Sequence, residues 1–78
     1  MSRRLDARGL RCPLPVLRLE ATLREASPGE RVIVLADDPI AVLDLPNAAR
    51  EGGHPCERLP DEGGACVFAV TRAAAVRG

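Results

Sequence analysis

The pattern of apolar and polar residues predicts four short strands, although the two alternate strictly only in the first. The first covers residues 3–7, where Leu5 and Ala7 share one face. The second, residues 31–36, carries a run of β-branched side chains that is typical of a buried strand. Residues 56–59 and 65–70 flank a turn rich in proline and glycine, and together they predict a hairpin.

A first helix is predicted from about Pro13 to Ala26. Proline is tolerated in the first turn of a helix, and the sequence Ser27-Pro28-Gly29 ends the pattern. Apolar residues at helical spacing give this helix a face that points to the core. They are Val16, Leu19, Leu23 and Ala26.

A second helix is predicted from Pro39 to about Glu51, with Asp38 as its N-cap. Two glycines follow it and supply the stop. Pro46 lies inside this helix, removes one hydrogen bond and crowds the preceding turn, so we expect a kink or two short pieces.

The element order β-α-β-α-β-β predicts an α+β fold, a two-layer sandwich with a mixed four-stranded sheet and both helices packed on one face. Crossover connections between strands are right-handed, so we expect the first two strands to be parallel. Residues 1–78 read as a single domain with an ordered core of about 3–72, and we expect the tail from Thr71 onward to fray.

The parallel arrangement has a consequence for Cys12, which follows the first strand, and for Asp37 and Asp38, which follow the second. Parallel strands end at the same edge of a sheet, and open α/β sheets bind their ligands there. We therefore expect Cys12 to lie on a shared rim with both aspartates nearby.

Composition narrows the classes of function. The 78 residues carry 11 basic and 11 acidic side chains, so we expect no bulk attraction to nucleic acid or to an anionic membrane. No apolar stretch approaches membrane-spanning length and no apolar signal segment opens the chain. We therefore expect a cytoplasmic protein, in a compartment where thiols are kept reduced, and three cysteines, an odd number, also argue against a disulfide scaffold.

Cys12 is the strongest candidate for chemistry. With Cys12 at the cap, the helix dipole and the nearby Arg8 and Arg11 favour the thiolate, while the aspartates oppose it. Pro13 and Pro15 have no N–H, so only Leu14 can donate a first-turn backbone hydrogen bond to the sulfur. These opposing effects predict a modestly lowered pKa for Cys12.

Pro15 stands where a dithiol oxidoreductase has its second cysteine, so this loop cannot close an internal disulfide. A lone activated thiol can instead take sulfur from a persulfide donor and hold it as its own persulfide. The alternative is that Cys12 is a small buried residue at a helix start. Leu14 and Leu17, with Ala21, form a second apolar stripe, which is either the edge of the core or a docking patch for a partner.

The remaining polar residues have simpler interpretations. His54, Cys56 and Cys66 together with Cys12 do not have a usual zinc spacing, so we expect no metal and no cofactor. Asp37 and Asp38 precede a helix, which favours capping over acid–base catalysis. The arginine-rich N-terminal segment is typical of a solvated face, with an RNA contact as the alternative.

The segment Leu5-Asp6-Ala7-Arg8-Gly9-Leu10-Arg11-Cys12-Pro13-Leu14-Pro15 resembles the opening of the bacterial TusA-like (SirA-like) sulfur-carrier family, with its Cys-Pro-x-Pro motif. The resemblance continues in Pro28-Gly29-Glu30, Ala36-Asp37-Asp38-Pro39 and Asp44-Leu45-Pro46. It spans nearly the whole chain in matching order, and it implies the same βαβαββ fold.

The resemblance also implies a function, namely that Cys12 accepts sulfur as a persulfide and passes it to another protein. The implied partners are a cysteine desulfurase or another persulfide donor, and a downstream acceptor in tRNA thiolation, molybdenum-cofactor supply or sulfur metabolism. Such a chain is a sulfurtransferase-like carrier rather than a self-contained enzyme. The alternative is a non-catalytic regulatory or interaction module of the same fold, with a redox-sensing or RNA-binding role.

Overall fold

The computed structural model describes residues 2–74 and contains six elements in the predicted order. They are β1 (Ser2–Asp6), α1 (Leu14–Glu25), β2 (Arg31–Ala36), α2 (Pro39–Glu51), β3 (Cys56–Glu62) and β4 (Ala65–Thr71). The strands form one four-stranded sheet in the order β1-β2-β4-β3. β1 and β2 are parallel, whereas β4 runs antiparallel to both of its neighbours. The predicted α+β fold with a mixed sheet is confirmed.

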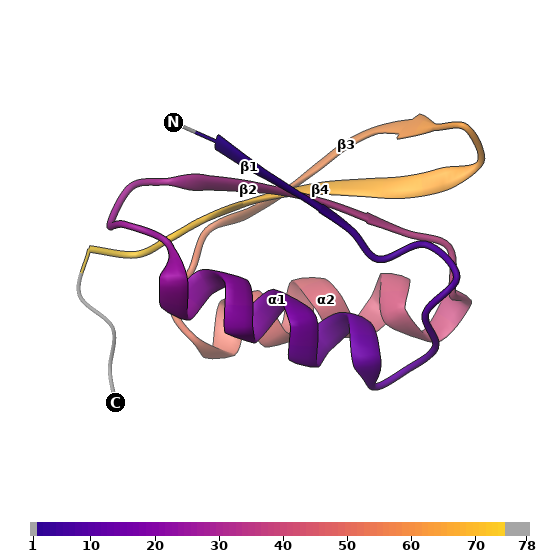
Figure 1. Cartoon of the computed structure of the whole chain (residues 1–78), viewed down its shortest axis with the longest axis horizontal. Helices are drawn as coiled ribbons and strands as arrows, with labels where there is room; N and C mark the ends of the chain where they lie inside the picture. The colour runs from indigo at the N-terminus through magenta and orange to yellow at the C-terminus, as the bar shows by residue number, and fades with distance from the viewer. Residues whose placement is uncertain (1, 75–78) are drawn as a thin grey trace.

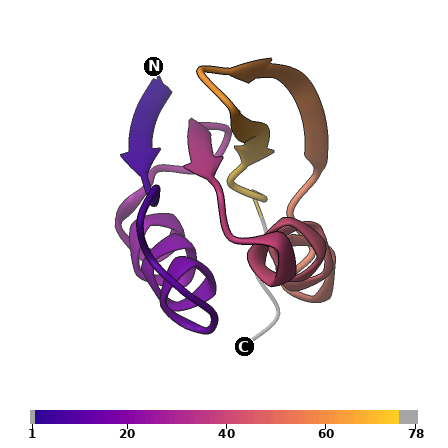
Figure 2. The same ribbon diagram turned by 90° about the vertical axis from the view of Figure 1, so that its right-hand side faces the viewer.

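The sheet and the helices form two layers (Figure 1). Both helices lie side by side beneath the same face of the sheet, and both begin at the edge where β1 and β2 end (Figure 2). Most of the buried apolar residues fill the space between the layers. The largest fully buried side chains on this side of the sheet include Leu19 of α1, Leu45 of α2 and Val34 of β2.

α1 begins one residue later than predicted. Pro13 is its N-cap, so Pro15 takes the second helical position and Cys12 stands before the cap. The N–H of Leu14 donates to the carbonyl of Arg11 at 2.8 Å, because a turn at residues 11–14 precedes the helix. That N–H is therefore not available to the sulfur of Cys12.

α2 is one continuous helix through Pro46, so the expectation of two short pieces is wrong. Its start is as predicted, because the Asp38 side chain accepts a hydrogen bond from the N–H of Ala41 and Pro39 follows in the first turn. Pro46 removes only its own N–H from the ladder. The fully buried Leu45 and the buried Ala49 anchor the helix against the core on both sides of it.

The hairpin strand β3 is longer than predicted and includes Pro60. β3 is at the edge of the sheet, where a missing N–H costs no ladder hydrogen bond, and its pairing with β4 is irregular between Leu59 and Glu62. The turn itself needs glycine, since Gly63 and Gly64 have φ values of +57° and +83°.

Thr71 and Arg72, with which we expected the frayed tail to begin, are hydrogen-bonded into the fold. Thr71 belongs to β4, the N–H of Arg72 donates to the carbonyl of Glu30, and the N–H of Gly29 donates to the carbonyl of Arg72, both at 2.8 Å. The rest of the tail that we expected to fray includes residues 75–78, which lie outside the described residues.

Candidate functional site

Cys12 belongs to the connection between β1 and α1. This connection lies on the rim where both helices begin (Figure 2). The structure brings it together with the connection between β2 and α2, as the parallel strands suggest. The Cys12 N–H donates to Asp38 Oδ2 at 3.1 Å, and the Gly9 N–H donates to Asp37 Oδ1 at 3.0 Å. Asp38 Oδ2 also accepts from Ala41 N at 3.3 Å, so one oxygen caps α2 and holds the cysteine loop.

The Cys12 side chain is half-buried, and its peptide bond to Pro13 is cis. Its Sγ–H donates to Asp44 Oδ2 of α2 at 3.2 Å. This hydrogen bond raises the pKa of the Cys12 thiol, and partial burial and the negative charges of Asp44 and Asp38 act in the same direction. The prediction of a lowered pKa is therefore wrong.

The two arginines expected to favour the thiolate are not paired with it. Arg8 turns back to Asp6 and donates to both carboxylate oxygens, at 2.8 and 2.7 Å. That pairing holds the pKa of Asp6 well below its usual range. The Arg11 side chain is exposed and forms no hydrogen bond or ion pair within residues 2–74. Neither arginine therefore pairs with the Cys12 sulfur, and neither is a cause of the shift in its pKa.

Four large apolar side chains are exposed in the opening turns of the two helices beside Cys12. They are Leu14, Leu17, Ile40 and Leu43, with exposures of 48%, 52%, 57% and 69%. We call this set the apolar rim. The first two belong to the second stripe seen in the sequence, and their exposure shows that they are not the edge of the core. Pro13 is exposed and Pro15 is buried, so the second proline anchors α1 against the interior.

Sequence reasoning missed Asp44, Ile40 and Leu43 as members of this site. Ile40 and Leu43 have the same three-residue spacing after a proline-containing helix start as Leu14 and Leu17, and that repeated pattern could have found them. Asp44 flanks the buried face of α2 immediately before Leu45. A half-buried carboxylate at that position indicates a hydrogen-bond donor on a neighbouring element, but the sequence does not identify the donor.

The other two cysteines lie in the hairpin strands. Cys56 pairs with Val70 at the far end of the sheet, whereas Cys66 pairs with Ala36, the last residue of β2, at the end where the rim lies. Cys56 packs against the core and burial raises the pKa of its thiol, while Cys66 Sγ accepts a hydrogen bond from the Arg58 guanidinium at 3.2 Å. His54 is only 7% exposed, and its Nδ1 accepts from Ala73 N at 3.0 Å. Within residues 2–74, no three His, Cys, Asp or Glu side chains come together as a metal site would require.

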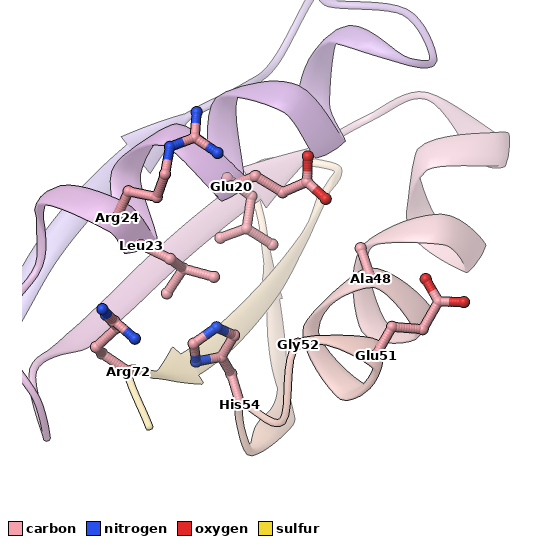
Figure 3. A pocket seen from close by; sticks show the side chains of 9 residues that line it. Glu20, Leu23, Arg24, Ala48, Glu51, Gly52, His54 and Arg72 are labelled. Atoms are coloured by element: carbon pink, nitrogen blue, oxygen red, sulfur yellow. The ribbon is translucent and has the colours of Figure 1, made fainter. Parts of the chain in front are cut away.

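A groove of about 380 Å³ lies at the other end of the helices (Figure 3). Its walls come from the later turns of α1 and α2, together with His54 and Arg72. Glu20, Arg24 and Glu51 stand at its margins, with their charged ends mixed in sign (Figure 3). Cys12 does not line this groove, so the thiol is presented on an open rim rather than inside the cavity.

Fold and rim together define the class: a small two-layer α+β protein that presents one thiol between two helix starts. A family model described as "Sulfurtransferase TusA" matches residues 3–72. The chain therefore belongs to the TusA family, and the resemblance seen in the sequence is confirmed.

Two known proteins illustrate the likeness. A protein of Allochromatium vinosum named "Sulfur carrier protein TusA" is 40% identical over 68 residues, which cover 87% of this chain and 90% of the relative. The crystal structure of a SirA-like protein from Desulfitobacterium hafniense superposes with a TM-score of 0.80 at 31% identity, covering 94% of this chain and 99% of that one.

No helix among the described residues is both long and apolar enough to cross a membrane.

Proposed function

We propose that this protein is a sulfur carrier in which Cys12 accepts sulfur as a persulfide and delivers it to a downstream protein. One observation carries the proposal: the thiol of Cys12 stands on an open rim between two helix starts, and the first turns of both helices expose large apolar side chains. The name of the Allochromatium relative supports the same role.

The chemistry needs one thiol and no cofactor. Cys12 Sγ attacks the terminal sulfur of a donor persulfide, a new S–S bond forms, and the donor's S–S bond breaks. The electron pair leaves on the donor's sulfur, which takes up the proton that Cys12 loses. An acceptor thiol then repeats the same exchange on the Cys12 persulfide, so sulfur moves without any net oxidation.

Transfer of this kind requires contact between two proteins. We assign partner binding to Leu14 and Leu17, now extended to Ile40 and Leu43, because these exposed apolar side chains belong to the first turns of the two helices that begin at the cysteine rim. Asp37 and Asp38 also face this rim. Pro13 and Pro15 fix the backbone after Cys12, and Arg8 and Arg11 precede Cys12 in the connection from β1.

The arginines of the N-terminal segment argue against the RNA-binding alternative. Arg3 pairs with Glu30, Arg4 pairs with Glu62 and Arg8 pairs with Asp6, each at 2.6 or 2.7 Å. Their charges are compensated within the fold, so they form no basic stripe of the kind that follows a phosphate backbone. The alternative that remains is an interaction module with an unreactive Cys12, which the raised pKa of that thiol favours.

A loading experiment separates the two. Incubation with a cysteine desulfurase and cysteine, without added reductant, should add the mass of one sulfur atom to the wild type. Cys12→Ala should gain none, while Cys56→Ala and Cys66→Ala, as matched controls, should load like the wild type. Equal loading of Cys12→Ala and the wild type would contradict the carrier function.

We place this carrier in the cytoplasm, where thiols are kept reduced, and its three cysteines are all free. Its acceptors are proteins of tRNA thiolation, molybdenum-cofactor supply or sulfur metabolism. Offering the loaded protein to one purified acceptor from each pathway, and following loss of the added sulfur mass from Cys12, distinguishes them.

A further inference from the structure

The thiol of Cys12 lies in an acidic environment. Asp44 Oδ2 accepts its hydrogen bond at 3.2 Å, and Asp38 Oδ2 is bonded to the Cys12 N–H at 3.1 Å. Both carboxylates come from α2 or its cap. A persulfide donor is itself anionic, so these carboxylates oppose its approach to the free protein.

No cationic side chain among the described residues pairs with either carboxylate. Neither Asp38 nor Asp44 forms an ion pair within residues 2–74. Of the two arginines in the loop, Arg8 is engaged with Asp6, and Arg11 is exposed and forms no ion pair within residues 2–74. The charge balance at the rim is therefore incomplete until something else supplies a cation.

We infer that Asp44 keeps Cys12 protonated in the free protein, and that a sulfur-transfer partner activates the thiol by placing a cationic side chain against Asp44. This inference rests on the proposed carrier function and names the chemistry of the partner. Such a partner has an arginine, lysine or protonated histidine beside its own reactive sulfur. Apolar surface around that cation covers the apolar rim of Leu14, Leu17, Ile40 and Leu43.

The proton balance of this step is complete. The partner's cation pairs with Asp44, which then no longer holds the Sγ–H. The Sγ–H bond breaks as Sγ bonds to the terminal sulfur of the donor persulfide, and the donor's S–S bond breaks. The electron pair and the proton both end on the departing sulfur of the donor, so no oxidant or reductant is consumed. Asp44 acts as a positioning residue, because it sets the state of the thiol rather than touching the transferred sulfur.

The raised pKa of Cys12 supports this arrangement, since the hydrogen bond to Asp44 is its largest cause. A protonated thiol reacts slowly with stray electrophiles and disulfides, because the thiolate is the nucleophile. Activation by the partner therefore confines reaction to docked complexes, which gives specificity to a thiol that has no enclosing cavity.

The first test measures alkylation of Cys12 by iodoacetamide against pH, with the modified peptide identified by mass spectrometry. Asp44→Asn keeps the shape and removes the charge, so its alkylation midpoint should fall to lower pH. At neutral pH the variant should react at least about fivefold faster than the wild type, because the repulsion between the Asp44 carboxylate and the Cys12 thiolate, a few ångströms apart, is removed. Glu51→Gln makes the same change at the far end of α2 and should match the wild type.

The second test uses two small disulfides of opposite charge, cystamine and dithiodiglycolate, at low ionic strength. Cys12 of the wild type should exchange with the cationic reagent much faster than with the anionic one, and high salt should shrink the difference. Asp44→Asn should lose most of this preference, and Glu51→Gln should keep it. Asp44→Glu, which retains the charge, should preserve both the preference and the slow alkylation.

An alkylation profile of Asp44→Asn that coincides with the wild type overturns the inference about the thiol. A changed profile with an unchanged reagent preference overturns the part about a cationic partner. Neither test involves a persulfide, so the two proposals can fail separately. If the wild type prefers the cationic disulfide as expected but does not load with sulfur, only the proposed carrier function is overturned. Circular dichroism of each variant establishes that the differences come from a folded protein.

Discussion

Replacing Asp38 by alanine tests the link between the second helix and the cysteine loop. One oxygen, Asp38 Oδ2, accepts from Ala41 N at 3.3 Å and from Cys12 N at 3.1 Å. Loss of an N-cap costs about 1 kcal/mol, and loss of one backbone hydrogen bond costs about 1 kcal/mol more. The expected loss in the free energy of unfolding is therefore about 2 kcal/mol, which for a domain of this size lowers Tm by about 10 °C.

Urea unfolding followed by circular dichroism measures this loss. The midpoint should fall while the slope with urea stays constant, because the surface exposed on unfolding is unchanged. Asp38→Asn is the matched control, since a single amide oxygen can accept both bonds, and it should stay within about 0.5 kcal/mol of the wild type. Equal stability of Asp38→Ala and the wild type, or equal losses in the two variants, would refute the reasoning.

Three further predictions concern other parts of the molecule. In Gly52→Ala, the new Cβ would stand 2.9 Å from His54 Cδ2 and 3.1 Å from His54 Nε2. Because His54 is buried and its Nδ1 accepts a hydrogen bond from Ala73 N, it cannot move away freely, so the free energy of unfolding should fall by about 1–3 kcal/mol. Thermal unfolding measures this loss, and an unchanged Tm would contradict the crowding. The pKa of His54 is lowered, first by burial and then by the charge of Arg72, so the unfolded chain takes up that proton first and stability should fall as pH drops below the ordinary value of 6.5. Urea midpoints against pH should show this slope in the wild type, and its persistence in His54→Gln would assign it to another group. Leu17→Ser and Leu43→Ser should each change the free energy of unfolding by less than about 0.5 kcal/mol, because both side chains are half or more exposed. Both substitutions should nevertheless slow sulfur loading by raising KM for the donor. Unaltered loading in the double variant would show that the donor does not touch the apolar rim.

The features that could be predicted from the sequence are those fixed by local interactions. Asp38 followed by Pro39 defines a helix start within four residues, and the structure shows that cap. β2 was bounded correctly from its run of β-branched side chains, since burial on both faces gives such a strand a continuous apolar pattern. The common rim also followed from local information, because a strand–helix–strand crossover makes β1 and β2 parallel, and parallel strands end at the same edge of the sheet.

The features that could not be predicted depend on how distant elements are oriented. The contact between Cys12 and Asp44 joins residues that are 32 positions apart, and it depends on the rotation of α2 about its own axis. Arg8 was expected to act on Cys12, but a carboxylate two residues away, on Asp6, captured it with two short bonds. Pro60 was placed in a turn because proline interrupts most strands, and only its position at the sheet edge makes it compatible with β3.

The two ends of the sheet are held together by different kinds of bond. At the end formed by Gly29, Glu30 and Arg72, two main-chain hydrogen bonds join the turn to the residue after β4, and they remain when the side chain of Arg72 or Glu30 is replaced, although the ion pair of Arg3 with Glu30 is then lost. At the rim, the cysteine loop is tied to the second helix through the carboxylates of Asp37, Asp38 and Asp44, and a single substitution can remove or alter each tie. Mutations can therefore retune the surface that meets other proteins while the opposite end preserves the architecture. A designer who wishes to redirect this protein to a new partner should vary the opening turns of the helices and leave the far end alone.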